Sequence, residues 1–222
     1  MKIENVKACV FDAYGTLFDV NSAASKCKGK LGSKWEGFAN AWRTTQLEYT
    51  WLRSLMKKHK NFWEITEDSL DHTMETFKIK KEMRNELLDL YKKLSPYPEV
   101  KKCLDGLKTK KIKISILSNG TPDLLKGLVE SNNIQNYFDD VFSIESVGIY
   151  KPDSSVYEMP IKKYDCKPEN ICFMSSNTWD VSGGGIFGYK AVWVNRLNKV
   201  FDKLSYKPKH VINNLEELLE II

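Results

Sequence analysis

The sequence predicts an α/β protein, with a doubly wound parallel-sheet (Rossmann-like) core and an inserted helical cap domain. Three observations predict this fold. The second half of the chain alternates strand patterns with helix patterns. A short, β-prone apolar run over residues 6–11 stands near the N-terminus and ends at Asp12. Between these two regions, residues 21–95 show helical periodicity without a good strand pattern.

The N-terminal run is expected to form a buried parallel strand, because strands covered on both faces are continuously apolar. Such a strand would deliver Asp12 to the carboxyl edge of the sheet, where open α/β folds bind their ligands. The turn Gly15-Thr16 follows, which makes Asp12 a candidate nucleophile. On this motif alone, a loop cap or a helix N-cap is an equally good interpretation.

The insertion is predicted to be helical throughout. Its larger side chains recur at helical steps, at Phe38, Trp42, Thr45, Tyr49, Leu52 and Met56. Pro96 and Pro98 close it, because proline does not suit a helix interior. We therefore expect a cap domain over residues 19–97 and a core domain over residues 1–18 and 98–222. The aromatic residues of the cap have three alternative roles, which are internal packing, a dimer surface and a lid over the site.

The second half returns to regular alternation. Helices are expected near 99–109, 122–132, 153–164 and 180–187, and strands at 113–117, 170–174 and 191–195. The last of these helices contains three glycines at 183–185, which cost roughly 2 to 3 kcal/mol relative to alanine. We interpret them as a place where this helix packs closely on the sheet.

Composition excludes several classes of function. The chain has 222 residues and a net charge of +5, but its lysines are spread along the sequence among acidic neighbours, so no nucleic-acid partner is expected. The 5 cysteines lack CxxC spacing, which argues against a disulfide framework and a zinc site. No signal segment is visible and no apolar run approaches ~18 residues, so no membrane partner and a cytoplasmic location are expected.

Polar residues follow two further predicted strands, and another polar group precedes a predicted helix. They are Ser118-Asn119, Lys151-Pro152 and the run from Ser175 to Asp180. Taken separately, the first is an ordinary turn, Lys151 an ordinary surface lysine and Asp180 an acid at a helix start. If the sheet is parallel, however, all of them meet Asp12 at one edge, and this shared location points to a site.

This set resembles the four motifs of the haloacid dehalogenase superfamily. Within it, the chain is most similar to the (S)-2-haloacid dehalogenases, through residues 12–20, 42–43, 46–56, 118–120, 150–153 and 175–180. The resemblance spans nearly the whole chain. It implies hydrolytic dehalogenation of short (S)-2-haloalkanoic acids to (R)-2-hydroxyalkanoic acids through an aspartyl-ester intermediate. It also implies a homodimer, and its partners would be the 2-haloacid substrate and the halide product.

The chemistry of the residues agrees with this resemblance. Tyr14 and Ser176 stand where superfamily phosphatases carry acids that protonate the leaving group and help to hold Mg²⁺. Asp12 and Asp180 beside a cationic Lys151 make a poor magnesium site, so neither a metal nor another cofactor is expected. Halide leaves without a proton, so a site without a general acid suits carbon–halogen displacement.

Catalytic roles can be assigned on this basis. Asp12 would attack carbon 2, Lys151 would stabilise its anion, and Asp180 would act as the general base toward water. The resemblance implies that Ser175 and Asn177 orient Asp180. We further expect Thr16 to orient Asp12 and, from the resemblance, Tyr157 to support the site near Lys151.

Substrate-binding roles follow from the groups that the substrate carries. Ser118, with amides of the Asp12 loop at Ala13 and Tyr14, suits the carboxylate. Arg43 and Asn119 resemble the residues that accept the halide. An apolar pocket is expected from Tyr14, Leu47, Phe62 and Trp179. One departure from the family is Thr44, where relatives often carry glutamine.

Two alternatives to dehalogenation stay open at this point. A capped phosphatase of the same superfamily is disfavoured by Tyr14 and Ser176. A non-catalytic binding protein is disfavoured because Asp12, Lys151 and Asp180 are all present.

Overall fold

The computed structural model describes residues 2–222, and within that range six strands form one sheet in the order β3-β2-β1-β4-β5-β6. The strands are β1 (Ala8–Phe11), β2 (Lys113–Ser118), β3 (Asp140–Ser143), β4 (Ile171–Ser175), β5 (Lys190–Val194) and β6 (His210–Ile212). Every neighbouring pair is parallel. The carboxyl ends of the strands therefore meet at one edge of the sheet, with β1 between β2 and β4.

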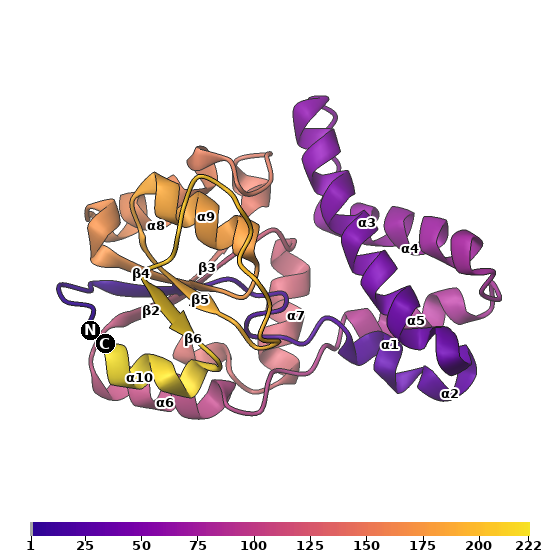
Figure 1. The fold of residues 1–222 in the computed structure, drawn as a ribbon, viewed down its shortest axis with the longest axis horizontal. Coiled ribbons are helices and arrows are strands. Elements are labelled where there is room, and N and C mark those ends of the chain that lie inside the picture. The colour runs from indigo at the N-terminus through magenta and orange to yellow at the C-terminus, as the bar shows by residue number, and fades with distance from the viewer. Residues whose placement is uncertain (1) are drawn as a thin grey trace.

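Helices cover both faces of the sheet. In Figure 1, α6 (Val100–Thr109) and α10 (Leu218–Ile221) lie on one side, and α8 (Ser154–Tyr164) and α9 (Thr178–Phe187) lie on the other. The helix α7 (Pro122–Ser131) connects β2 to β3. All residues of β1 and β4 are buried, as the apolar character of the first predicted strand implies. The doubly wound parallel-sheet prediction is confirmed.

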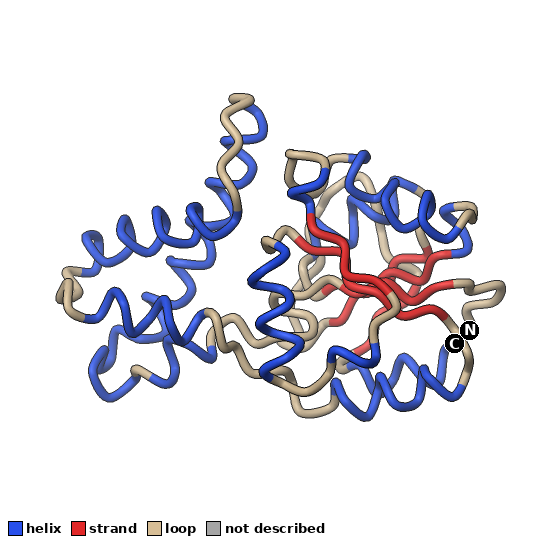
Figure 2. The backbone as a smooth tube through the Cα atoms, turned by 180° about the vertical axis from the view of Figure 1, so that it is seen from behind, coloured by secondary structure: helices blue, strands red, loops and turns tan. Residues whose placement is uncertain are grey.

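The region between β1 and α6 is helical. Its helices, which we call the cap, are α1 (Ser22–Lys26), α2 (Lys28–Leu31), α3 (Trp35–Leu55), α4 (Phe62–Phe77) and α5 (Met83–Tyr91). Residues 21–95, all of them described, contain no strand, and Figure 2 shows this part as a helical body beside the sheet. A capping box between Asn61 and Glu64 starts α4.

The buried face of α3 differs from the one predicted. Phe38 and Trp42 are buried as expected, but the buried face then continues through Gln46 and Thr50. Leu52 and Met56 are exposed, because they lie at the end of α3 that projects beyond the other cap helices (Figure 1). Polar residues can occupy the buried face because they find partners there. The Gln46 side-chain amide donates to Thr66, for example.

The two linkers between cap and core run side by side. The Asp19 N–H donates to the Ser95 carbonyl at 2.9 Å, and the Tyr97 N–H donates to the Leu17 carbonyl at 3.0 Å. Phe18 also forms an antiparallel bridge with Pro96. The outgoing and returning linkers are therefore joined immediately after the Asp12 loop.

Two further sequence expectations can be compared with the structure. Each of the cysteines lies in the described part of the chain and is free, and Cys166 is the one that is not fully buried. Within residues 2–222, no helix is both long and apolar enough to cross a bilayer.

Candidate active site

Asp12 lies directly after β1 at the carboxyl edge of the sheet and is 5% exposed. Among the described side chains, its Oδ2 atom accepts hydrogen bonds from Thr16 Oγ1 at 3.0 Å, Ser175 Oγ at 3.3 Å and Asn177 Nδ2 at 2.8 Å. These donors come from the loop after β1 and from the end of β4, which are adjacent because β1 pairs with β4. Ser175 and Asn177 therefore hold Asp12, and the expectation that they orient Asp180 is wrong. One oxygen of Asp12 is fixed in this way, while Oδ1 faces a different partner.

That partner is Lys151, whose side chain is fully buried. Its Nζ atom lies 3.3 Å from Asp12 Oδ1 and 2.9 Å from Asp180 Oδ2, so one ammonium bridges two carboxylates. The backbone N–H of Lys151 donates to Asn119 Oδ1 at 3.2 Å, which connects this loop to the end of β2. Lys151 is therefore a buried residue of the site, and the alternative interpretation as an ordinary surface lysine is wrong. Pairing with two carboxylates offsets the cost of burying its charge.

Asp180 lies in the first turn of α9 and is fully buried. Burial raises the pKa of its carboxyl to about 6, although the Lys151 ammonium acts in the opposite direction. The Tyr157 hydroxyl donates to Asp180 Oδ1 at 2.7 Å, and burial raises the pKa of Tyr157 well above its usual value, so the phenol stays a donor. Asp180 is therefore a carboxylate with one oxygen on Lys151 and the other on Tyr157.

The glycines of α9 make room for this arrangement. A Cβ atom on Gly183 would lie 2.5 Å from the Tyr157 hydroxyl, and one on Gly184 would lie 2.8 Å from the Phe173 ring of β4. The predicted close approach to the sheet thus holds for Gly184, whereas Gly183 faces Tyr157 on α8. The absence of a side chain at Gly183 lets Tyr157 reach Asp180.

Tyr14 is buried on the side of Asp12 that faces the cap. Its ring centroid lies 5.1 Å from that of Phe62 on α4 and 5.8 Å from that of Tyr91 on α5. Burial raises the pKa of Tyr14 well above its usual value, so this residue is a neutral phenol. The Tyr14 carbonyl accepts from Asn177 Nδ2 at 3.1 Å and from Arg43 Nη2 at 3.5 Å.

Arg43 reaches this region from α3. Its Nη1 atom donates to Gln46 Oε1 at 2.8 Å, and Gln46 in turn donates to Thr66 Oγ1 at 2.7 Å. Gln46 was not among the predicted site residues. The available signal was its position four residues after Trp42, which places it on the same face of the helix as that buried residue, where a polar side chain needs a partner.

The remaining predicted residues lie around this cluster with fewer contacts to it. Ser118 is fully buried at the end of β2, and its Oγ accepts from the Gly120 N–H at 3.1 Å. Ala13 is buried next to Asp12, and Leu47 is half-buried on α3. Trp179 is half-buried and meets Trp51 of the cap edge-on, with centroids 5.4 Å apart. Thr44, the departure from the family pattern, is exposed.

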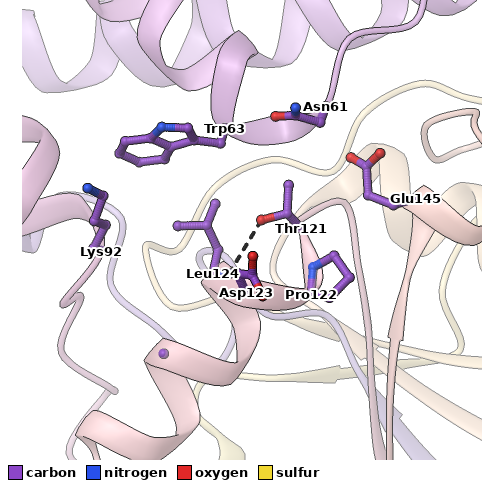
Figure 3. A pocket seen from close by; sticks show the side chains of 9 residues that line it. Asn61, Trp63, Lys92, Thr121, Pro122, Asp123, Leu124 and Glu145 are labelled. Atoms are coloured by element: carbon purple, nitrogen blue, oxygen red, sulfur yellow. Dashed lines mark hydrogen bonds between the residues drawn. The ribbon is translucent and has the colours of Figure 1, made fainter.

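A cavity of about 610 Å³ lies where the cap meets the N-terminus of α7 (Figure 3). It is lined by Asn61, Trp63, Lys92, Thr121, Pro122, Asp123, Leu124, Gly127 and Glu145. None of these lining residues belongs to the predicted site, although Asn61 and Trp63 flank Phe62 in the sequence. The cavity therefore lies between the cap and the core, and neither Asp12 nor Asp180 lines it.

The donor set does not form a typical metal centre. Across residues 2–222, no group of three or more His, Cys, Asp or Glu side chains is arranged to hold a metal ion. The position between the Asp12 and Asp180 carboxylates is occupied by the Lys151 ammonium.

The fold and this edge of the sheet define a class of hydrolase. The sequence profile of the haloacid dehalogenase-like hydrolases matches residues 6–188. The chain is 39% identical to (S)-2-haloacid dehalogenase 1 of Pseudomonas sp. (strain CBS-3), over 99% of this chain and 98% of that protein. It is 40% identical to the (S)-2-haloacid dehalogenase of Pseudomonas fluorescens, over 97% of this chain and 96% of that protein.

Solved structures agree with the sequence comparisons. The L-2-haloacid dehalogenase of Xanthobacter autotrophicus with chloropropionic acid covalently bound superimposes with a TM-score of 0.90 at 31% identity, over 97% of each chain. The chain therefore belongs to the haloacid dehalogenase-like hydrolases and, within them, to the (S)-2-haloacid dehalogenase family.

Proposed function

We propose that the protein hydrolyses short (S)-2-haloalkanoic acids to (R)-2-hydroxyalkanoic acids through an ester on Asp12. The observation that carries this proposal is the asymmetry of the Asp12 carboxylate. Three donors hold Oδ2, whereas Oδ1 faces the Lys151 ammonium and is the oxygen available to attack. The family relationship supports the substrate class, because the named relatives are (S)-2-haloacid dehalogenases.

In the first step, Asp12 Oδ1 attacks carbon 2 of the substrate in line with the halogen. The new carbon–oxygen bond forms as the carbon–halogen bond breaks, and halide leaves with the electron pair and without a proton. Tyr14 suits such a step because its raised pKa keeps it neutral, so it adds no charge beside the halide. In this proposal Arg43 and Asn119 receive the halide, and Ser118 with the amides of Ala13 and Tyr14 binds the carboxylate.

In the second step, water attacks the Asp12 carbonyl carbon. Asp180 takes a proton from this water and later returns it to the oxygen of the departing hydroxyacid, and the second proton of the water passes to solvent. The donors on Oδ2, which are Thr16, Ser175 and Asn177, then stabilise the negative charge on that oxygen in the tetrahedral intermediate. Tyr157 fixes the second oxygen of Asp180 and so orients the base.

Selectivity for small substrates is assigned to the apolar wall on the cap side. Tyr14 and Phe62 are buried and in contact, and Leu47 and Trp179 would complete the wall. In this proposal, residues 19–97 act as the cap domain, and residues 1–18 with 98–222 form the core domain.

We also propose that the protein acts in the cytoplasm as a homodimer, with the cap as the interface. The observation in support is the apolar end of α3, where Leu52, Leu55 and Met56 are 50%, 80% and 59% exposed. Light scattering of the pure protein tests this part, and a monomeric mass at micromolar concentration would reject it.

The direct test of the function measures halide release from (S)- and (R)-2-chloropropionate in buffer with EDTA, for the wild type and for Asp12→Asn. We expect release from the (S) substrate alone, no effect of EDTA, and no turnover by the variant. Absence of wild-type turnover, together with Mg²⁺-dependent release of phosphate from p-nitrophenyl phosphate, would favour the capped phosphatase instead.

A further inference from the structure

Arg196, just after β5, contacts the Asp12 loop from outside the cluster described above. Its Nη2 atom donates to the Thr16 carbonyl at 2.8 Å, and its Nη1 atom is ion-paired with Glu99 at the start of α6. The guanidinium carbon lies 3.8 Å from the centroid of the Tyr97 ring. The Arg196 and Glu99 side chains are 11% and 12% exposed, so this ion pair is largely shielded from solvent.

The residue that Arg196 contacts is the one that donates to the nucleophile. The Thr16 hydroxyl has one proton, which goes to Asp12 Oδ2, and the same oxygen accepts from the Ser176 N–H at 2.8 Å. Both bonds require the Thr16 backbone to stay in register with β1 and β4. The Thr16 carbonyl accepts a hydrogen bond from Arg196, so the same residue is held through its backbone as well.

Arg196 also joins the two linkers of the cap. Thr16 precedes the outgoing linker, and Tyr97 and Glu99 end the returning one, where the Tyr97 N–H donates to the Leu17 carbonyl. A planar guanidinium can bond in two directions while its face stacks on an aromatic ring, whereas a lysine ammonium cannot do all three together. The three contacts therefore call for arginine at this position.

We propose that Arg196 is a positioning residue for the dehalogenation. It fixes the Thr16 backbone so that the Thr16 hydroxyl donates to Asp12 Oδ2. Through Glu99 and Tyr97, it also connects Thr16 to the linker that returns from the cap. The inference rests on the proposed function, because it assigns Arg196 a role in stabilising the charge on Oδ2 during ester hydrolysis. Arg196 acts through Thr16 and does not touch the substrate.

The test is a double-mutant cycle of Arg196→Met and Thr16→Val, with kcat and KM measured on (S)-2-chloropropionate. Arg196→Met is expected to lower kcat about tenfold with KM changed less than about twofold, and to add less than about twofold in the Thr16→Val background. Arg196→Lys, which keeps the charge beside Glu99, is expected to lose about threefold. Arg84→Met, which removes an ion pair with Asp71 on the outside of the cap, is the matched control and should leave kcat unchanged.

Equal losses from Arg196→Met in both backgrounds, or no loss in either, would overturn the inference. A second readout does not depend on activity. Amide exchange followed by NMR should show the Ser176 N–H exchanging about tenfold faster in Arg196→Met, relative to the amides of β1, and unchanged in Arg84→Met. If the wild type released no halide, the proposed function would fail, and this exchange result would still decide whether Arg196 positions Thr16.

Discussion

The core and the cap contribute to the site in different ways. In the core, the charged groups are buried and held from more than one side. Lys151 lies between two carboxylates, and Asp180 bonds both Lys151 and Tyr157. In the cap, Arg43 is the charged residue that hydrogen-bonds to the Asp12 loop. It is half-buried, and its acceptors are the side-chain oxygen of Gln46 at 2.8 Å and the carbonyl of Tyr14 at 3.5 Å.

This difference indicates a division of labour. The core presents a preorganised set of charges, which is where most of the rate acceleration of an enzyme is expected to arise. The cap supplies aromatic surface and one cation, which suit enclosure, substrate fit and capture of the departing halide. Changes in the core should therefore affect kcat, and changes in the cap should affect KM and selectivity with smaller losses.

Apart from loss of the nucleophile itself, the largest effect is expected from Asp180→Asn in the core. The first step does not need the base, so halide should appear as a burst of roughly one equivalent per site, followed by turnover about 10²- to 10⁴-fold slower than in the wild type. Rapid-quench halide assays and the intact protein mass would detect the accumulated ester. A variant with neither burst nor ester would show that Asp180 is already needed before the ester forms.

The second-largest effect is expected from Lys151→Met. It removes the ammonium between two buried carboxylates, so kcat should fall about 10²- to 10³-fold. The uncompensated charges should also lower the free energy of unfolding by about 3–5 kcal/mol, measured by urea titration. Lys163→Met is the matched control, because its ion pair with Asp140 is largely exposed on the lysine side and contributes little. Similar unfolding midpoints for both variants would refute the structural part of this prediction.

The pH dependence of kcat tests the role of Asp180 in the core without a substitution there. Burial raises the pKa of Asp180 to about 6, and the base must be ionised to accept a proton. The kcat should therefore rise with pH along an acidic limb. Its midpoint should lie at or below pH 6, because ester formation removes the Asp12 charge that helps to raise this pKa. A kcat with no acidic limb down to about pH 4, where the carboxyl would be protonated, would contradict Asp180 as the base.

The smallest effect is expected from Gln46→Leu in the cap. Arg43 loses the acceptor of its Nη1 atom, so kcat/KM should fall about threefold to tenfold, mainly through KM. The acidic pH limb should be unchanged, because Asp180 is not touched. Glu48→Leu, at an exposed position on the same helix, should behave as the wild type. A loss in kcat as large as that of Lys151→Met would remove the distinction between cap and core.

Most of the core could be predicted from sequence, because its central strands are continuous apolar runs that end in polar residues. Asp12, Ser118 and Ser175 were placed at strand ends in this way, and the parallel pairing brings those ends to one edge. The strands β3 and β6 were missed, and they are the two edges of the sheet. Edge strands are short and partly exposed, so they lack the apolar run on which the prediction depends.

The polar partners of the site were harder to predict, because they depend on contacts between distant segments. The burial of Lys151 follows from two carboxylates that are remote in the sequence, and the link from Arg196 to Thr16 spans most of the chain. Gln46 looked like an ordinary helix residue because its partner, Thr66, lies on another helix. Helical periodicity places such residues on a face, and packing then decides which face is buried.

The proposed mechanism has Asp12 form an ester that water cleaves at the carboxylate carbon of Asp12. We would examine this step in a single turnover in H₂¹⁸O, with enzyme in excess over (S)-2-chloropropionate. We expect ¹⁸O to enter the peptide that contains Asp12 and the hydroxyacid of the first turnover to carry none. Label in the hydroxyacid and none in Asp12 would mean that water attacks the substrate directly and that no ester forms on Asp12.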